Sequence, residues 1–441
     1  MLLASEARRG TVVQGRALVI AVDGLDDLDV ASIAGGPLRT PGTCLDALLA
    51  GANPLRVRPG GPSEPAPALV SVMTGASVGH TGVATELALH PSEPTGAGVW
   101  YAGDLRTPTL LDQVGARGGV TCALQWPATA RGGPATARAG VDLCLPLVED
   151  LRRYRDRWSM VEQTSSARMV TEHLRARREA GVQLSQVEPD ELVAQIAEEA
   201  YTAGRVDLAA VRLTGLGRAR RLEGHGSTAA TRALADAIDA LGRVISAFRP
   251  TDADHVVLLP GRPLVPVELL VHPNTMLARR GLVSTDGPRL ADFRALVWPD
   301  GPRGALHVRR GEPDTVRDAA MEALAEVAAH CRLRLRRVDD GIGATDRTDV
   351  IAVLDGAPGT LFGLSPTHRP LVEGDDPYYA GPRAVSDPDA WSTALGQGDG
   401  LPSGPVEGAW ADLGVTLAGA LDVTLPGATA AGMCPAALAG A

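Results

Sequence analysis

The chain of 441 residues contains no lysine, because all 42 of its basic residues are arginine. This absence excludes chemistry that needs an amine side chain: Schiff-base catalysis, lysine-anchored pyridoxal phosphate and a phosphate-binding loop that ends in lysine. We attribute the preference for arginine to a GC-rich bacterial genome.

Aromatic residues and cysteine are also scarce. Aromatic side chains make up 3% of the sequence and hydrophobic residues 45%, so a core must be built mainly from Ala, Val and Leu. The five cysteines are Cys44, Cys122, Cys144, Cys331 and Cys434, and no two of them stand in a CxxC spacing. Such scattered thiols argue against a disulfide framework or a zinc knuckle and favour a reducing, cytoplasmic environment.

Long apolar runs and an excess of positive charge are absent as well. No segment reaches the roughly 20 apolar residues that cross a bilayer, and residues 1–15 lack the apolar stretch of a signal peptide. The formal net charge of -10 does not suit a protein that binds phosphate backbones. We therefore expect a cytoplasmic protein without a membrane or nucleic-acid partner, whose oligomeric state the sequence leaves open.

The most informative stretch comes early in the chain. Residues 17–22 form an uninterrupted apolar run that leads into Asp23 and Gly24. Such a run predicts a buried parallel strand, and in open α/β sheets ligands bind at the carboxyl ends of the strands. A carboxylate in that place can hold a metal ion, or it can simply cap the next turn.

Strands and helices continue to alternate along the chain. Further strands are predicted at residues 120–127, 206–213 and 255–259, and capped helices at residues 107–114 and 227–248. Strands that alternate with helices predict an α/β fold with a doubly wound, mostly parallel sheet.

Two segments depart from this alternation of strands and helices. Residues 128–204 are helical in pattern and show no strand pair, which predicts a helical insertion over one side of the sheet. Residues 301–353 place two short strands around a helix, which predicts a small βαβ-like α+β subdomain. The α/β core then comprises residues 1–300, with the insertion, and residues 354–441.

Several short motifs follow one another in the order of a known family. Residues 40–48 are similar to a TPNLDAL motif, residues 73–83 to VTG…GEHGI, residues 107–112 to PTLWDLL and residues 415–432 to TLAALLGVPLPGATGRPL. Together with the strand before Asp23, this order resembles the alkaline phosphatase superfamily, and most closely its type I phosphodiesterase and nucleotide pyrophosphatase branch. The resemblance implies the fold of that superfamily over nearly the whole chain.

The resemblance also implies a site. Members hydrolyse phosphoesters with two metal ions, held by about six Asp and His ligands, and a Ser or Thr nucleophile at a helix N-terminus. Asp23 matches the first ligand, but the motif TxPNH falls on residues 65–69, where proline and alanine replace the nucleophile and the Asn. The motif DxxxH falls on Gly217 and Arg221, and DHGM likewise finds neither ligand. With only Asp23 and a late His368 left, we expect no metal cofactor.

A shift in register leaves a second hypothesis open, a metal-dependent phosphodiesterase or pyrophosphatase that uses Zn or Mn through displaced ligands. Its candidates are Ser63 as nucleophile, His225, and the pair Asp254 and His255. The pair precedes its strand, so it should lie at the wrong end of the sheet. Ser63 equally suits a turn, and His225 equally suits a surface loop.

Arg221 and Arg262 favour reuse of the site, because they occupy or adjoin expected ligand positions. Guanidinium groups bind carboxylate or phosphate bidentately, although both arginines could equally face solvent. The first hypothesis is therefore a non-hydrolytic pseudoenzyme, or an enzyme with a new metal-independent reaction, that binds or transforms an anionic small molecule in bacterial specialised metabolism. In that case Asp23 and His368 would serve as base and acid around an anion held by Arg221 and Arg262. The displaced-ligand phosphodiesterase would instead use Asp23, His225 and His368. A third hypothesis is a scaffold whose insertion docks another protein.

Overall fold

A computed structural model describes residues 15–59, 61–90, 93–132, 140–150, 153–184, 189–338, 345, 347–374, 376, 379 and 381–435. Residues 1–14, where the sequence predicts no signal peptide, lie outside this range, as do parts of the two predicted segments (133–139, 151–152, 185–188, 339–344 and 346). None of the described helices has both the length and the apolar character needed to cross a membrane.

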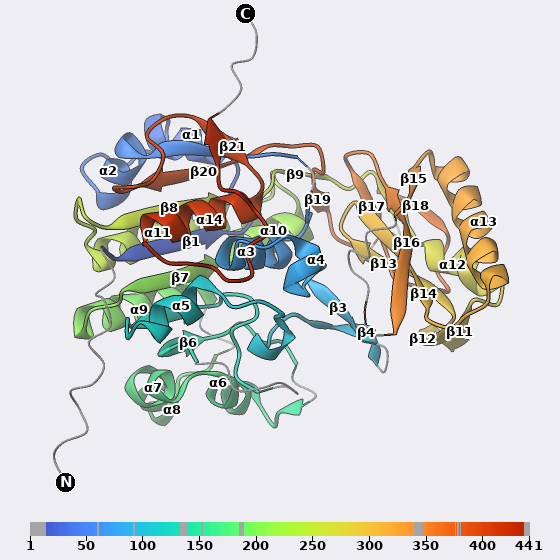
Figure 1. The fold of residues 1–441 in the computed structure, drawn as a ribbon, viewed down its shortest axis with the longest axis horizontal. Helices are drawn as coiled ribbons and strands as arrows, with labels where there is room; N and C mark the ends of the chain where they lie inside the picture. The colour runs from blue at the N-terminus through green and yellow to red at the C-terminus, as the bar shows by residue number, and fades with distance from the viewer. Residues whose placement is uncertain are drawn as a thin grey trace, which may run out of the picture.

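A nine-stranded mixed sheet forms the large lobe of the molecule (Figure 1). The strands from β8 to β6 run parallel, as the predicted α/β fold requires, and β20 runs antiparallel between β2 and β8. In spatial order the strands are β22 (Cys434–Pro435), β21 (Val406–Gly408), β2 (Asn53–Val57), β20 (Ser392–Gln397), β8 (His255–Pro260), β1 (Ala17–Val22), β7 (Leu208–Leu213), β5 (Thr121–Leu124) and β6 (Leu143–Leu145).

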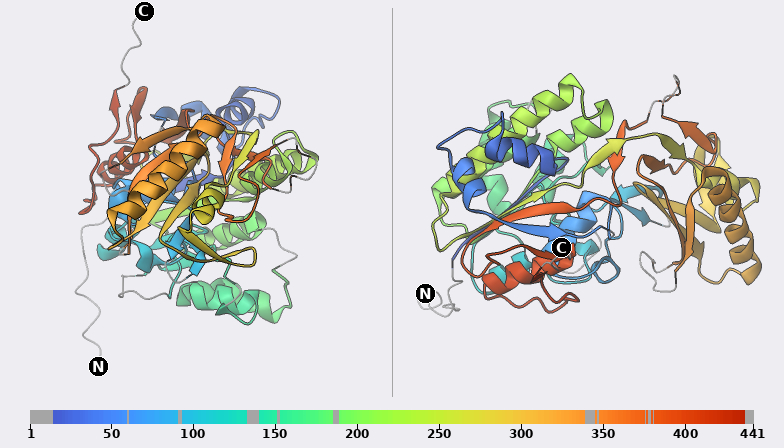
Figure 2. Two further views of the ribbon diagram at one scale, coloured as in Figure 1. Left: turned by 90° about the vertical axis from the view of Figure 1, so that its right-hand side faces the viewer. Right: turned by 90° about the horizontal axis from the view of Figure 1, so that it is seen from above.

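Helices cover both faces of this sheet, so the lobe has three layers (Figure 2). Side chains of β1 alternate between the two cores: Leu18 and Ile20 pack on one side, and Ala17 and Val19 on the other. The first layer contains α1 (Asp27–Gly35), α2 (Cys44–Gly51), α9 (Pro189–Ala203), α10 (Gly215–Glu223) and α11 (Thr228–Phe248); the second contains α3 (Pro65–Thr74), α5 (Leu110–Ala116) and α14 (Trp410–Ala420).

The predicted insertion is largely helical but contributes a strand. Besides α9 it contains α6 (Arg157–Thr164), α7 (Ala167–Met169), a π-helical turn (Val170–Leu174) and α8 (Arg175–Glu179). No strand pair is predicted here from the sequence; the structure has one strand, β6, because Leu143 and its neighbours pair in parallel with β5 and extend the sheet. Three residues are too short a run for a periodicity argument to detect.

A smaller lobe carries a four-stranded antiparallel sheet, seen to the right in Figure 1. Its order is β13 (Ala295–Asp300), β14 (Arg303–Arg309), β16 (Thr348–Asp355) and β15 (Arg334–Arg337), with α12 (Pro273–Arg279) and α13 (Asp314–Cys331) packed on it. This pairing differs from a βαβ unit, whose strands are parallel. The lobe also begins before residue 301, since β13 and α12 belong to its core.

Short ladders complete the described structure. They are β3 (Leu87–His90) with β4 (Glu93–Gly98), β9 (Leu264–Pro266) with β19 (Ala384–Ser386), β11 (Val283–Asp286) with β12 (Arg289–Phe293), and β10 (Leu269–Val271) between β17 (Thr360–Phe362) and β18 (Leu371–Glu373). A one-turn helix, α4 (Val78–Thr81), follows α3.

Candidate functional site

A small cavity of about 30 Å³ opens at the carboxyl ends of β1 and β8. It offers room for about one or two water molecules. This is the edge of the sheet at which α/β proteins bind ligands. The side chains that give it chemical character are Asp23, Ser63, Glu64, Arg221, Arg262 and Trp410.

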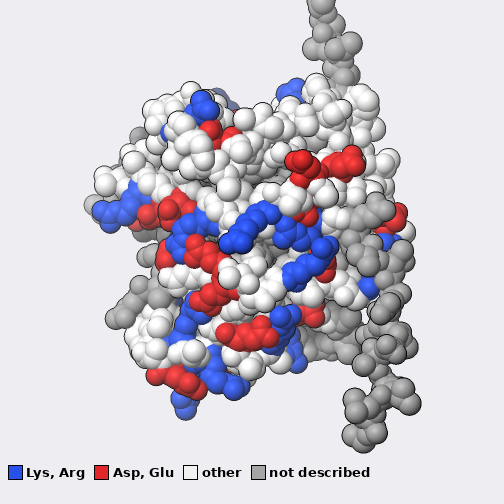
Figure 3. All heavy atoms as spheres, turned by 90° about the vertical axis from the view of Figure 1, so that its left-hand side faces the viewer, with Lys and Arg blue, Asp and Glu red and all other residues white. Residues whose placement is uncertain are grey.

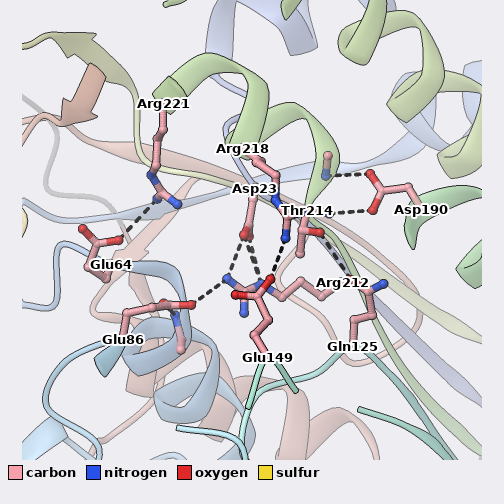
Figure 4. A network of polar contacts seen from close by, with 12 residues as sticks. Asp23, Glu64, Glu86, Gln125, Glu149, Asp190, Arg212, Thr214, Arg218 and Arg221 are labelled. Atoms are coloured by element: carbon pink, nitrogen blue, oxygen red, sulfur yellow. Dashed lines mark hydrogen bonds and ion pairs between the residues drawn. The ribbon is translucent and has the colours of Figure 1, made fainter. Parts of the chain in front are cut away.

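Asp23 is bound on both carboxylate oxygens by one guanidinium group (Figure 4). Arg212, on the neighbouring strand β7, donates from Nη2 to Oδ2 at 2.7 Å and from Nε to Oδ2 and Oδ1 at 3.1 and 3.2 Å. Both side chains are buried, with 7% and 5% of their surface exposed. Charge-assisted contacts of a guanidinium fork with a carboxylate are among the stronger hydrogen bonds in proteins, and here they occupy both oxygens of Asp23.

Arg212 also contacts a second carboxylate, Glu86, at 3.2 Å from Nη2 to Oε1. The other oxygen of Glu86 accepts the backbone N–H of Ala66, in the first turn of α3, at 2.8 Å. Burial alone would raise the pKa of Glu86, but Arg212 and the Ala66 N–H outweigh it and lower that pKa. Glu86 therefore stays ionised as an internal anion at the N-terminus of α3.

The sequence of α3 leaves no other backbone donor in this turn. Pro65 and Pro67 flank Ala66, and proline has no N–H. The one donor that remains is occupied by Glu86. The anion that this helix N-terminus faces is therefore a carboxylate of the chain itself.

Arg221, near the end of α10, approaches Glu64 with a distance of 3.4 Å from Nη2 to Oε2. Burial raises the pKa of Glu64, and the nearby Glu86 and Asp23 raise it further. Burial would lower the pKa of Arg221, but the same carboxylates raise it overall. Both directions follow from a cluster in which three carboxylates face two guanidinium groups, those of Arg212 and Arg221.

Arg262 lines the same cavity from the segment after β8. It donates to the backbone oxygens of Pro62 and Ala390, each at 3.1 Å. Burial and the nearby Arg303 lower its pKa to about 10, so it remains charged at neutral pH. Arg221 and Arg262 thus share the cavity with Asp23, as the sequence-based hypothesis required.

Three glycines pack the backbone tightly around Asp23. A Cβ on Gly217 would lie 2.7 Å from the Cβ of Asp23, and a Cβ on Gly261 would lie 2.7 Å from the backbone N of Gly24. Gly24 itself has a φ of 77° and faces the Cα of Gly217. Positions 217 and 261 lie where the resemblance expects metal ligands, and here neighbouring backbone fills the space that their side chains would need.

The residues around Asp23 therefore do not fit the two-metal centre that the resemblance implies. Within the described residues no group of three or more His, Cys, Asp or Glu side chains is arranged to hold a metal ion. The oxygens of Asp23 are directed at Arg212.

The structure brings only one of the displaced-ligand candidates to the cavity. Ser63 lines it, and its buried hydroxyl has no hydrogen-bond partner among the described residues. His225 is exposed after the end of α10 and does not line the cavity. Asp254 and His255 lie at the opposite end of the sheet, where His255 stands beside Ala17 in the ladder.

His368 belongs to the small lobe. Its exposed ring lies edge-on to His272, with 5.1 Å between the ring centres, and its backbone oxygen accepts from Thr275 at 2.9 Å. It does not line the cavity with Asp23. The structure therefore does not bring Asp23 together with the histidine that was predicted to act with it as acid or base.

Sequence reasoning missed Arg212, Glu86 and Glu64. Arg212 carried a signal, since it is the one charged residue in the otherwise apolar strand Leu208–Leu213. A second missed contact lies beside it, where the carboxylate of Asp190 accepts the backbone N–H groups of Thr214 and Gly215, both at 2.8 Å (Figure 4).

A family model described as type I phosphodiesterase / nucleotide pyrophosphatase matches residues 17–352. The chain belongs to this family. It is thereby a member of the alkaline phosphatase superfamily, as the ordered motifs indicated. A search of curated proteins finds no match.

Solved structures confirm the α/β fold. Murine ectonucleotide pyrophosphatase / phosphodiesterase 5, determined as an inactive variant in complex with AMP, is 14% identical with a TM-score of 0.59, over 93% of this chain and 96% of that one. Phosphonoacetate hydrolase from Sinorhizobium meliloti 1021, in complex with phosphonoformate, is 13% identical with a TM-score of 0.57, over 94% and 97%. At such identities the likeness shows the fold alone.

Proposed function

We propose that this family member is a non-hydrolytic or repurposed protein that binds a small anionic molecule without a metal ion. The observation that carries the proposal is the bidentate contact of Arg212 with Asp23, because a guanidinium group binds the carboxylate that the resemblance assigns to a metal ion. Fixed positive charge from arginine replaces the charge of a metal ion in this account.

Arg221 and Arg262 are the proposed anion-binding residues. Arg221 is the more available of the two, since 27% of its side chain is exposed and its contact with Glu64 is loose at 3.4 Å. Since the cavity holds only about one or two water molecules, the anion would place a single carboxylate or phosphate oxygen there, in competition with Glu64, and the rest of the molecule would stay at the cavity mouth. The Ser63 hydroxyl, which lines the same space, can donate a further hydrogen bond. We assign no reaction to this arrangement.

Titration of the purified protein with inorganic phosphate and with succinate, followed by calorimetry, tests this proposal. We expect binding that weakens on the order of tenfold or more in Arg221→Met and in Arg262→Met, because a charge-assisted hydrogen bond is lost. Arg369→Met is the matched control, since 79% of that side chain is exposed in the small lobe. Absence of binding, or equal losses in all three variants, would refute the proposal.

The metal-dependent phosphodiesterase remains the second candidate, favoured by family membership and by the Ser63 hydroxyl in the cavity. Hydrolysis of an aryl phosphodiester with zinc or manganese, abolished by Asp23→Ala or Ser63→Ala, would establish it in place of the first. Two tightly bound ions per chain in elemental analysis would have the same consequence.

We also propose a cytoplasmic location for the protein. All five cysteines are unpaired, and two of them, Cys122 and Cys144, are buried. Free thiols of this kind persist in a reducing compartment.

A further inference from the structure

The turn between β13 and β14 joins the small lobe to the wall of the cavity. At this turn the backbone N–H of Ser63 donates to Oδ2 of Asp300 at 3.3 Å, and Arg303 donates from Nη1 to the backbone oxygen of Gly61. Between these two residues Gly301 lies so close that an added Cβ would be 3.0 Å from Oε1 of Glu64. Residues 300–303 thus hold residues 61–64 in place, and Ser63 and Glu64 form part of the cavity wall.

The surroundings of Asp300 disfavour a negative charge on its carboxyl group. Its Oδ1 is buried without a hydrogen-bond partner among the described residues. Burial and the neighbouring Glu64 raise the pKa of Asp300 to about 7, although the backbone N–H groups of Ser63 and Glu64 and the charge of Arg303 act in the opposite direction. Arg262 also faces this carboxyl from the segment after β8.

We propose that the turn at residues 300–303 is a clasp between the lobes that holds the cavity wall when Asp300 is protonated and releases it when Asp300 ionises. The proposal concerns the wall itself, so it stands whether or not the cavity binds an anion. Release would withdraw the segment of Ser63 and Glu64, and with it the partner of Arg221.

The direction of the effect follows from linkage. In the closed clasp the carboxyl binds its proton with a pKa of about 7, whereas its ordinary value in water is 3.8. The closed state therefore binds the proton more tightly, and ionisation favours the open state. Opening should become on the order of tenfold more favourable for each pH unit between about 4 and 7, and it should level off above pH 7.

Amide hydrogen exchange of the intact protein tests the clasp directly, because Ser63 supplies the N–H that Asp300 accepts. Pro62, Pro65 and Pro67 have no amide, so a peptide over residues 61–68 has few reporters besides Ser63 and Glu64. After correction for intrinsic exchange rates, we expect protection at these two residues to fall on the order of tenfold per pH unit from pH 5 to 7.

Asp300→Asn should abolish this pH dependence, because an amide does not ionise, while keeping the shape of the side chain. Asp349→Asn, at a half-buried aspartate of the same sheet that pairs with Arg310 and Arg317, is the matched control and should keep the wild-type pH dependence at Ser63 and Glu64. Gly301→Ala should expose Ser63 and Glu64 at every pH by pressing on Glu64. Protection that does not change with pH, or the same pH dependence in Asp300→Asn, would overturn the proposal.

Discussion

The two ends of the central sheet use the same chemistry in opposite ways. At the amino end, Arg16 binds Asp254 with contacts of 2.7, 2.9 and 3.1 Å, and Thr251 adds two more hydrogen bonds. Although burial acts against it, these contacts hold the pKa of Asp254 well below its usual range. At the carboxyl end, burial raises the pKa of Glu64, Asp190 and Asp300.

The difference separates a structural ion pair from a site. Carboxylates at the amino end are satisfied and stabilise the fold. At the carboxyl end, Asp23 and Glu86 are paired with Arg212. Burial disfavours the charged form of the other three carboxylates there, and groups perturbed in this way cluster at functional sites. On the side of the molecule away from the small lobe, arginine and carboxylate side chains are interspersed over the visible surface (Figure 3), whereas the charges around the cavity are drawn together inside the protein (Figure 4).

The largest loss of stability is expected from Arg212→Met, because this residue pairs with carboxylates at the carboxyl end of the sheet. Removal of this guanidinium group leaves Asp23 and Glu86 without their shared partner, and one of them is buried. We expect the free energy of unfolding in urea to fall by about 3–5 kcal/mol.

Arg16→Met is the matched variant at the amino end, where 20% of the arginine side chain is exposed. Its loss should be smaller, about 1–2 kcal/mol. In the double variant Asp23→Asn with Arg212→Met, part of the stability should return because no buried charge is left unpaired. Equal losses for Arg212→Met and Arg16→Met would remove the distinction between the two ends.

Asp300→Asn should stabilise the protein at pH 8. The closed fold holds this carboxyl with a pKa of about 7 against an ordinary 3.8, so its ionised form costs stability above pH 7. The gain is on the order of 3 kcal/mol after allowance for a weaker hydrogen bond to Ser63. It should shrink as the pH falls through 7 and vanish near pH 4, and urea unfolding at several pH values measures it.

Asp254→Asn should have the opposite sign. The pKa of Asp254 is lowered in the fold, so its charge stabilises above the ordinary value of 3.8 and ceases to do so as the pH falls below it. We expect a loss of about 2 kcal/mol at pH 7 that disappears in strong acid. A loss that is constant with pH would mean that shape rather than charge matters here.

The smallest effects are expected from His225→Ala and His368→Ala. Both side chains are exposed and neither lines the cavity. Stability should change by less than about 0.5 kcal/mol, and binding of phosphate or succinate should stay the same. A large loss of phosphodiester hydrolysis in either variant would favour the metal-dependent candidate instead.

Elements with strong periodicity were predicted well. Apolar runs located β1 and β8, and the helix predicted at residues 227–248 agrees with α11 to within a residue or two. The prediction missed β20, whose residues alternate with small glycine and alanine positions, and β6, which has three residues. Such strands are specified by the neighbours they pair with, and that information is not local in the sequence.

The sequence placed three of the candidate residues at one edge of the sheet, but did not reveal their contacts. Asp23, Arg221 and Arg262 follow strands or occupy matched motif positions, so the sequence could place them at one edge. Glu86 could not be found, because its partners Arg212 and Ala66 lie 126 and 20 residues away. Which charged side chains contact one another depends on how the fold brings distant segments together, and residue type alone does not reveal this.

The close contact of Gly24, Gly217 and Gly261 limits which residues these positions can accept. With 2.7 Å between each hypothetical Cβ and its neighbour, no single replacement at these positions can be accommodated without moving one chain segment against another. A side chain at position 217 or 261 therefore needs a second, compensating change nearby. Laboratory selection for a new activity would find easier starting points among Ser63, Glu64 and Arg221.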